Sequence, residues 1–150
     1  MITISSGIVL LYENKILLCH PTNSKWNGTY SIPKGKNENE KETLLEAAIR
    51  ETKEETGIDL NKFKKLIELK HHQIPWSGLI EYKDKKNKIY KKVVYYILEI
   101  NNLNEIGLKS DIIPKEQLDL EEIDWAGFLN KKEAEKKIFW RFKELLKLIN

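Results

Sequence analysis

The sequence contains a single cysteine, Cys19, so an intrachain disulfide is excluded and a reducing compartment such as the cytoplasm is expected. It also lacks any apolar run approaching the ~20 residues of a membrane-spanning helix, which argues against a membrane partner. Residues 1–11 have neither a basic start nor a small-residue cleavage site, and we do not expect them to be a signal peptide. Together these absences favour a cytoplasmic protein.

Arginine is scarce as well. Lysine and arginine together number 26, yet Arg50 and Arg141 are the only arginines. The position of Arg50 inside an acidic segment therefore indicates a need for the planar guanidinium, which can pair with a carboxylate through two parallel hydrogen bonds. The net charge of +3 is mild. It suits a polyanionic substrate but does not by itself indicate nucleic acid.

The length of 150 residues suits one domain, residues 1–150, with a hydrophobic core of its own. Apolar and turn patterns predict strands at residues 2–11, 15–20, 30–32, 66–74, 89–100 and 123–129, and helices at 42–56 and 131–149. Residues 75–87 are predicted to form a loop or hairpin tip, and 101–118 an irregular segment. This order predicts an α/β (α+β) fold in which helices cover a mixed sheet.

Residues 35–58 carry the most informative pattern. A helix over 42–56 would align Leu44, Ala47, Ala48, Glu51 and Glu55 on one stripe, with Glu54 beside it. The stripe is apolar in its first half and acidic in its second half. Three carboxylates near one interface repel one another and stay ionised together only when a cation joins them. Hard carboxylate oxygens select Mg²⁺, Mn²⁺ or Ca²⁺.

The same segment resembles the Nudix box, which reads Gly, five residues, Glu, seven residues, then Arg-Glu-hydrophobic-any-Glu-Glu-any-Gly-hydrophobic. Here Glu42 is followed after seven residues by RETKEETGI, residues 50–58, in register. Six residues instead of five separate Gly35 from Glu42, and Thr52 stands where an aliphatic residue is usual. The resemblance extends over most of the chain and implies the Nudix fold, a mixed sheet sandwiched between helices.

The resemblance also implies roles for the residues of the box. Glu54 and Glu55 would be the principal ligands of Mg²⁺ or Mn²⁺, and Glu51 would be a further ligand or the base that takes a proton from water. The carbonyl of Gly35 would be another ligand, and the additional loop residue bears most directly on this assignment. Arg50 would hold a carboxylate of the box in place rather than touch the substrate.

Several residues outside the box are candidates for the same site. Glu122 is our candidate for a base or ligand from outside the box, and the alternative is a solvated loop residue. The candidate substrate-binding residues are Lys34, Lys92, Tyr96 and Trp26. Each has an ordinary alternative, because a lysine can be solvated and an aromatic ring can cover the core. The lysine cluster at 83–88 would favour RNA if it is more than a solvated tip.

The resemblance leads us to expect a divalent-metal-dependent hydrolase that cleaves a phosphoanhydride in a nucleoside diphosphate linked to another moiety. The motif Pro33-Lys34-Gly35 resembles that of dinucleoside polyphosphate hydrolases, which makes a dinucleoside polyphosphate the first substrate candidate. The 5′ end of RNA and a damaged nucleoside triphosphate are alternatives. A non-catalytic module that binds a nucleotide or RNA is the alternative from another class. A homodimer is compatible with the resemblance, but the sequence does not specify the oligomeric state.

Overall fold

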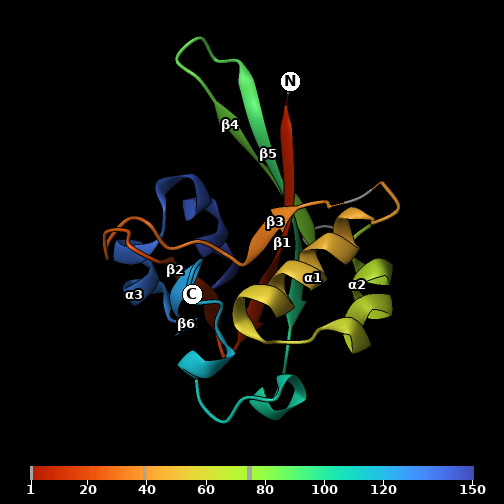
Figure 1. Cartoon of the computed structure of the whole chain (residues 1–150), viewed down its shortest axis with the longest axis vertical. Helices are drawn as coiled ribbons and strands as arrows, with labels where there is room; N and C mark the ends of the chain where they lie inside the picture. Colours follow the sequence, from red (N-terminus) through yellow and green to blue (C-terminus); the bar gives the residue numbers. More distant parts are fainter. Residues whose placement is uncertain (1, 39, 74–75) are drawn as a thin grey trace.

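The computed structural model describes residues 2–38, 40–73 and 76–150 of the chain (Figure 1). The strands are β1 (Thr3–Tyr12), β2 (Lys15–Pro21), β3 (Lys34–Lys36), β4 (Ser77–Lys83), β5 (Ile89–Glu99) and β6 (Ile123–Leu129). The α-helices are α1 (Leu44–Thr56), α2 (Lys64–Lys70) and α3 (Lys131–Lys137). Short 3₁₀ segments are η1 (Asn61–Phe63), η2 (Leu103–Ile106), η3 (Lys115–Gln117) and η4 (Trp140–Leu148).

The six strands form one sheet in the order β4-β5-β1-β2-β6, with β3 paired to β1. β1 and β5 run parallel, whereas the other pairs are antiparallel. The turn between β1 and β2 places Glu13 at φ 46° and Asn14 at φ 61°. Two successive left-handed residues match the twist of a tight hairpin. The predicted mixed sheet is confirmed.

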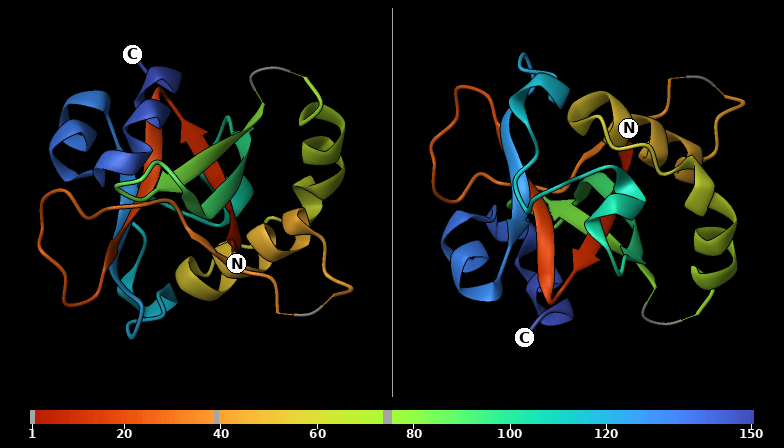
Figure 2. Two further views of the ribbon diagram at one scale, coloured as in Figure 1. Left: turned by 90° about the horizontal axis from the view of Figure 1, so that it is seen from above. Right: turned by 90° about the horizontal axis from the view of Figure 1, so that it is seen from below.

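Helices cover both faces of this sheet, and Figure 2 shows the layers from above and below. Alternation along β1 sends Ile8 and Leu10 into one core and Val9 and Leu11 into the other. The first core lies under α1 and α2, and the second lies under α3 and η4. The predicted sandwich of helices around a mixed sheet is therefore correct.

Helix α1 begins two residues later than predicted, because Thr43 caps it. The Thr43 hydroxyl accepts a hydrogen bond from the Glu46 amide at 3.1 Å, and the Glu46 carboxylate accepts one from the Thr43 amide at 2.9 Å. The helix ends at Gly57, whose φ of 76° is the left-handed conformation expected of a glycine after a helix. Thr52 is fully buried and donates its hydroxyl to the Ala48 carbonyl at 2.8 Å.

The strand predicted at 66–74 is wrong. Its first part belongs to helix α2, and Ile74 lies outside the described residues. In α2 only Ile67 is buried, while Leu66 and Leu69 remain exposed. A seven-residue helix with one buried side chain has no clear helical period, and the run of apolar residues resembled a strand instead.

Two further segments differ from the prediction. The segment 75–87, expected to be a loop or hairpin tip, contains strand β4, which pairs antiparallel with β5; Pro75 lies outside the described residues. The tip itself is a short turn in which Asp84 accepts hydrogen bonds from the amides of Lys86 and Lys88, both at 2.9 Å. At 30–32 only isolated bridges form, and the regular strand is β3.

The closing helix predicted at 131–149 is interrupted. α3 ends where Ile138 and Phe139 turn extended, and η4 follows. The Phe139 amide donates to the Tyr30 carbonyl at 2.9 Å, and Ile138 forms a parallel bridge with Tyr30. Pairing with the loop that follows β2 therefore replaces helical hydrogen bonds at this point, a tertiary effect that the apolar pattern does not reveal.

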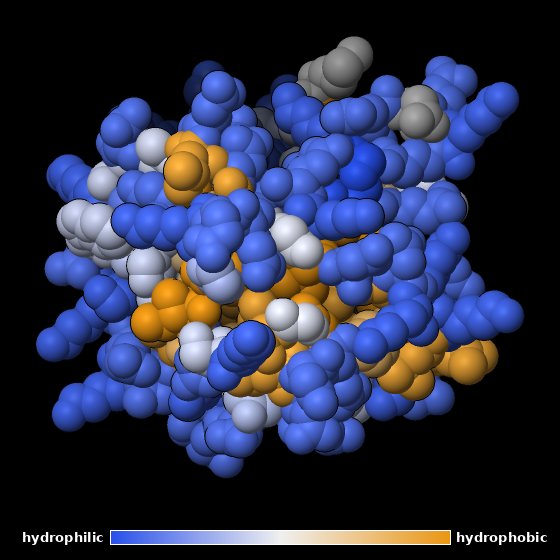
Figure 3. All heavy atoms as spheres, turned by 60° about the horizontal axis from the view of Figure 1, so that its bottom comes forward, coloured by the Kyte–Doolittle hydropathy of each residue, from blue (hydrophilic) through white to orange (hydrophobic). Residues whose placement is uncertain are grey.

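Hydrophilic side chains cover much of the face shown in Figure 3, with hydrophobic side chains gathered between them. Among the described helices, none combines the length and the hydropathy that crossing a membrane requires.

Candidate active site

The acidic half of α1 faces strand β3 across a cleft of about 490 Å³. Its lining residues are Lys34, Gly35, Lys36, Glu38, Glu51, Glu54, Glu55, Asp119 and Glu122. Three stretches that are distant in the sequence meet here: β3 with the loop after it, the helix, and the turn before β6. The cleft thus contains six of the sequence-predicted site residues: Lys34, Gly35, Glu51, Glu54, Glu55 and Glu122.

Gly35 lies directly against Glu51. A Cβ atom at Gly35 would overlap the Glu51 carboxyl group, so any side chain at this position would force that carboxylate to move. β3 is held in register by pairing Gly35 with Ser6 of β1. The additional residue between Gly35 and Glu42 therefore does not displace Gly35 from the helix, and the loop after β3 accommodates it.

Arg50 connects the carboxylates behind the cleft. Its Nε donates to Glu42 Oε1 at 2.6 Å and its Nη2 donates to Glu42 Oε2 at 3.2 Å, which is the two-bonded geometry available to a guanidinium. Its Nη1 donates to Glu51 at 2.9 Å and to Glu54 at 3.2 Å. The same Nη1 lies 3.3 Å from a carboxylate oxygen of Glu38. One arginine thus orients four carboxylates.

The carboxylates differ in their electrostatic environment. Burial raises the pKa of Glu55 to about 8, and the charges of Glu51 and Glu122 add to the effect. The Lys34 amide opposes it by donating to Glu55 at 3.1 Å. Burial also raises the pKa of Glu51, against the hydrogen bond from Arg50. A buried carboxylate beside other carboxylates holds its charge unfavourably, and a cation in the cleft would relieve this.

The donor set fits a hard divalent cation. Glu38, Glu51 and Glu54 each offer a carboxylate oxygen, and these oxygens lie within 4.8 Å of one another. Arg50 offsets only one of the three negative charges of this trio, and no described arginine contacts Glu55. The cleft therefore keeps an excess of negative charge that a divalent cation would balance.

Residues 1–144 match the NUDIX domain family. The chain belongs to the Nudix family. The predicted Nudix box is therefore the acidic segment that lines the cleft, and the predicted class of enzyme, a Nudix hydrolase acting on phosphoanhydride bonds, is confirmed. Comparison with curated proteins gives no significant match.

Solved structures share the fold at low sequence identity. An Ap4A hydrolase from C. elegans in a binary complex is 22% identical, with a TM-score of 0.63 over 97% of this chain and 93% of that one. A MutT NUDIX hydrolase from Burkholderia pseudomallei is 14% identical, with a TM-score of 0.64 over 100% and 99%. The NUDIX domain of Shewanella oneidensis NrtR, complexed with ADP ribose, is 13% identical, with a TM-score of 0.59 over 98% and 85%. At these identities the solved structures show that this chain has the same fold, and no more.

Three cleft residues were missed by the sequence analysis: Lys36, Glu38 and Asp119. Glu38 lies in the loop after β3, and its amide donates to Glu42 at 3.1 Å. Asp119 precedes β6, and its amide donates to the Glu55 carbonyl at 3.1 Å. The acidic run around Glu38 was a visible signal. Asp119 gave none, because only the docking of its turn onto the end of α1 brings it to the cleft.

The turn that contains Asp119 also brings Glu122 to the cleft. The amide of Glu122 donates to the Asp119 carbonyl at 2.9 Å, which closes the turn. Gln117 packs against Gly57, and its side-chain amide donates to the Thr56 carbonyl at 3.4 Å. The C-terminal end of α1 therefore anchors the turn, and both side chains of the turn that line the cleft remain exposed.

Three of the predicted substrate-binding residues do not line the cleft. Tyr96 is only 8% exposed and belongs to the core under α1 and α2, where its ring meets the edge of His71. Lys92 pairs with Ile4 and Glu81 within the sheet. Tyr96 therefore packs in the core, the ordinary alternative for an aromatic ring, on the face of β5 that α1 and α2 cover.

Trp26 also lies away from the cleft. Its ring is 57% exposed and stacks on His20 at 4.1 Å between centroids. His20 is buried and contacts Asp124 at 2.5 Å and the Lys25 carbonyl at 2.8 Å. The loop that carries Trp26 is therefore fastened to the sheet through a histidine.

The backbone and the side chain of Lys34 contact different parts of the protein. Its amide points at Glu55, whereas its ammonium lies 6.0 Å from the centroid of the Phe142 ring, over the second core. The expectation that Lys34 stands beside the carboxylates therefore holds for its backbone, while its charge is directed toward η4.

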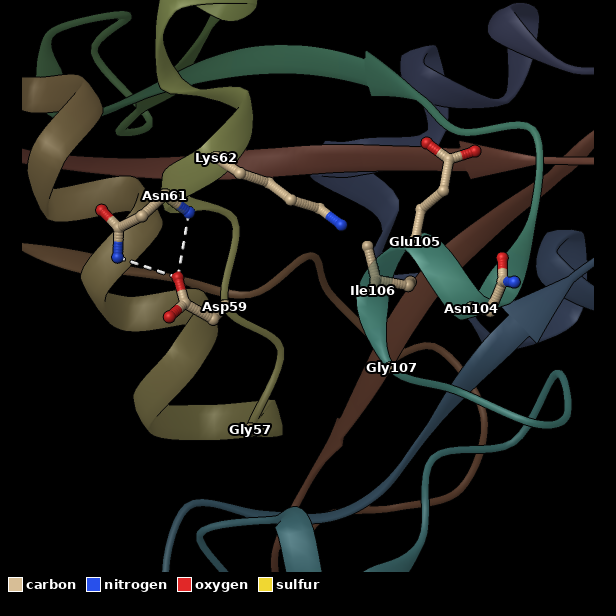
Figure 4. A pocket seen from close by; sticks show the side chains of 8 residues that line it. All are labelled: Gly57, Asp59, Asn61, Lys62, Asn104, Glu105, Ile106 and Gly107. Atoms are coloured by element: carbon tan, nitrogen blue, oxygen red, sulfur yellow. Dashed lines mark hydrogen bonds between the residues drawn. The ribbon is translucent and has the colours of Figure 1, made fainter.

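A second cleft, of about 480 Å³, separates the end of α1 from η2 (Figure 4). Its acidic groups are used in local structure. Asp59 accepts hydrogen bonds from the backbone amide and the side chain of Asn61, at 2.9 and 2.8 Å. Glu105 accepts from the amides of Asn101 and Asn102. Both carboxylates stabilise turns, so this cleft lacks the gathered acidic oxygens of the first.

Proposed function

We propose that this Nudix hydrolase uses Mg²⁺ or Mn²⁺ to cleave a phosphoanhydride in a nucleoside diphosphate linked to another moiety. The observation that carries the proposal is the cleft that Glu51, Glu54 and Glu55 line together with Gly35, which lies against Glu51. A bound divalent cation would neutralise phosphate charge and activate water. Glu54 and Glu55 would hold it, with Glu51 as a further ligand or as the base.

The remaining residues of the site would position these groups. Arg50 fixes the side chains of Glu51 and Glu54, so that neither has to be ordered when substrate binds. Glu122 and Asp119 border the opposite side of the cleft, and either carboxylate could accept a proton from water there. The lysines of β3 would attract the anionic substrate to this edge.

A dinucleoside polyphosphate is the first substrate candidate. The support is the Pro33-Lys34-Gly35 motif together with the similarity in fold to an Ap4A hydrolase. Other solved structures with this fold include a bifunctional NMN adenylyltransferase/ADP ribose pyrophosphatase from Francisella tularensis, 16% identical with a TM-score of 0.58 over 99% of this chain and 42% of that one. The diversity of neighbours means that the substrate has to be found by assay.

The test is a panel of diadenosine tetraphosphate, ADP-ribose, nucleoside triphosphates and 5′-triphosphorylated RNA, each with Mg²⁺, Mn²⁺ or EDTA. Glu54→Gln should lower turnover roughly 100-fold or more, by the effect of losing a key charged group at a site. Glu68→Gln is the matched control, because both glutamates are 51% exposed and both form ion pairs with a basic residue four positions earlier.

Absence of turnover on every substrate would refute the catalytic proposal and favour a binding module instead. Equal activity in the Glu54→Gln and Glu68→Gln variants would refute the assignment of the site while leaving the enzyme class intact. Turnover that persists in EDTA would refute the requirement for a divalent metal.

A further inference from the structure

The second arginine of the chain, Arg141, lies in a group of aromatic rings next to the turn of the β4–β5 hairpin. Its guanidinium carbon is 4.2 Å from the ring centroid of Trp140, 4.6 Å from that of Tyr82 and 5.9 Å from that of Tyr90. Its Nη2 donates to the Tyr90 hydroxyl at 3.4 Å. We call Tyr82, Tyr90, Trp140 and Arg141 the aromatic–arginine platform.

Part of this platform faces solvent. The Trp140 residue is 61% exposed and Tyr90 is 46% exposed, whereas Tyr82 is 8% exposed and anchors the group to the second core. A core function does not account for two large aromatic residues at this level of exposure. The planar guanidinium stacked between them keeps their faces in fixed orientations.

Positive charge surrounds the platform. The hairpin tip carries Lys83, Lys85, Lys86 and Lys88, all exposed. The Nζ of Lys91 lies 5.1 Å from the Tyr82 ring centroid. Among the described residues, neither these lysines nor Arg141 forms an ion pair with a carboxylate. The only acidic residue of the tip, Asp84, accepts hydrogen bonds from backbone amides.

The basic region continues toward the acidic cleft. Lys34 and Lys36 are on the same side of β3 by strand alternation, and the Lys34 ammonium is directed toward η4. Burial lowers the pKa of Lys91, and the charges of Lys34 and Lys36 lower it further. The charges of these three lysines therefore act on one another, and the lysines form a basic region between the platform and the edge of the cleft.

We propose that the aromatic–arginine platform and the hairpin lysines bind single-stranded nucleic acid. Exposed aromatic faces accept unpaired bases by stacking, and lysines follow the phosphates without reading sequence. The tip of the hairpin projects beyond the rest of the molecule in Figure 1, which leaves the tip accessible to a nucleic-acid strand from solvent. The surface would therefore take an oligonucleotide of any sequence, and its role is separate from hydrolysis.

The test measures binding without chemistry. A 3′-fluorescein-labelled decauridylate with a 5′-hydroxyl end contains no phosphoanhydride, and EDTA removes divalent metal, so the experiment is independent of the proposed function. Its fluorescence anisotropy should rise with protein concentration, and affinity should fall with added salt. Decathymidylate should bind comparably, because stacking and phosphate contacts do not require a 2′-hydroxyl.

Two substitutions test the stacking. Trp140→Ala should weaken binding about 5- to 100-fold, the effect expected for losing one base–aromatic contact. Trp26→Ala is the matched control, since Trp26 is similarly exposed at 57% but lies on another loop, and it should change affinity less than about 2-fold, within the range of ordinary surface substitutions. Arg141→Lys keeps the charge but removes the plane, and it should weaken binding as well.

A third variant tests the charges. Replacing Lys85, Lys86 and Lys88 together by glutamine should lower the slope of log affinity against log salt by about 2, at ~0.7 per phosphate contact on a single strand. Thermal unfolding of each variant verifies that it is folded. Any one of three results would overturn the proposal. The first is no change in anisotropy up to about 100 µM protein, a concentration at which weak non-specific binding would still be seen. The others are an equal loss of affinity in the two tryptophan variants, and tighter binding of a duplex than of a single strand.

Discussion

Replacing Arg50 by lysine should destabilise the protein, although the charge is kept. A lysine has one ammonium and cannot reproduce the two bonds to Glu42 while also reaching Glu51 and the Lys36 carbonyl. A hydrogen bond to a charged partner contributes ~1.5–3 kcal/mol when buried. Arg50 is 23% exposed, so some solvent screening remains. We expect the free energy of unfolding to fall by about 2–3 kcal/mol for the lost fork.

The measurement is urea unfolding at 25 °C, together with a thermal scan in which Tm should fall by roughly 5–10 °C for a chain of this size. Mg²⁺ should also raise the free energy of unfolding of the variant more than that of the wild-type protein. A metal ion could contact several carboxylates at once, which the lysine ammonium cannot do. Arg141→Lys is the control, since Arg141 has no carboxylate partner among the described residues, and it should cost less than about 1 kcal/mol.

Either of two results would refute this reasoning. An Arg50→Lys variant that unfolds within about 0.5 kcal/mol of the wild type, the size of an ordinary surface change, would mean that the fork adds nothing to a simple charge. A loss of the same size in Arg141→Lys would mean that arginine stabilises this chain through packing alone, wherever it lies.

Four other substitutions test the geometry around the helix. Gly35→Ala should lower both stability and turnover by displacing Glu51, with circular dichroism and the nucleotide assay as the two measurements. Thr52→Val should be neutral or stabilising by up to about 1 kcal/mol, since the Thr52 hydroxyl only supplements a helix carbonyl, whereas Thr56→Val should destabilise in urea by removing the acceptor of the Ile58 amide. The pKa of Glu46 is lowered from 4.5 to about 2, chiefly by the hydrogen bond from the Thr43 amide. The ionised carboxylate therefore stabilises the folded protein above pH 4.5, and this stabilisation is lost as the pH falls toward 2. The urea midpoint of Glu46→Gln should approach that of the wild type over this pH range.

The parts of the fold that the sequence predicted are those with strong local signals. β1 and β5 are long and β-branched, and the box helix combines an apolar stripe with a glycine stop. Helix α2 was missed because a single buried residue, Ile67, holds it against the core, so its stability comes from packing rather than from its own pattern.

The site divides in the same way. Residues within α1, such as Glu51 and Glu55, could be placed on one face from helical periodicity alone. Asp119 could not, because its position depends on a backbone hydrogen bond to a residue 64 positions earlier. Tyr96 was assigned to the substrate because alternation leaves the choice of face open, and only the packing of α2 over the sheet decides it.

Strand β3 separates two charge environments in three residues. Gly35 lies against Glu51 and leaves room for its carboxyl group, whereas the Lys34 ammonium lies 6.0 Å from the centroid of the Phe142 ring, over the second core. A side chain at position 35 would overlap the Glu51 carboxyl group and displace it from the cleft. The spacing of the Pro-Lys-Gly-Lys segment therefore matters through strand alternation: it gathers negative charge on one side for a cation and leaves positive charge on the other side for a polyanion.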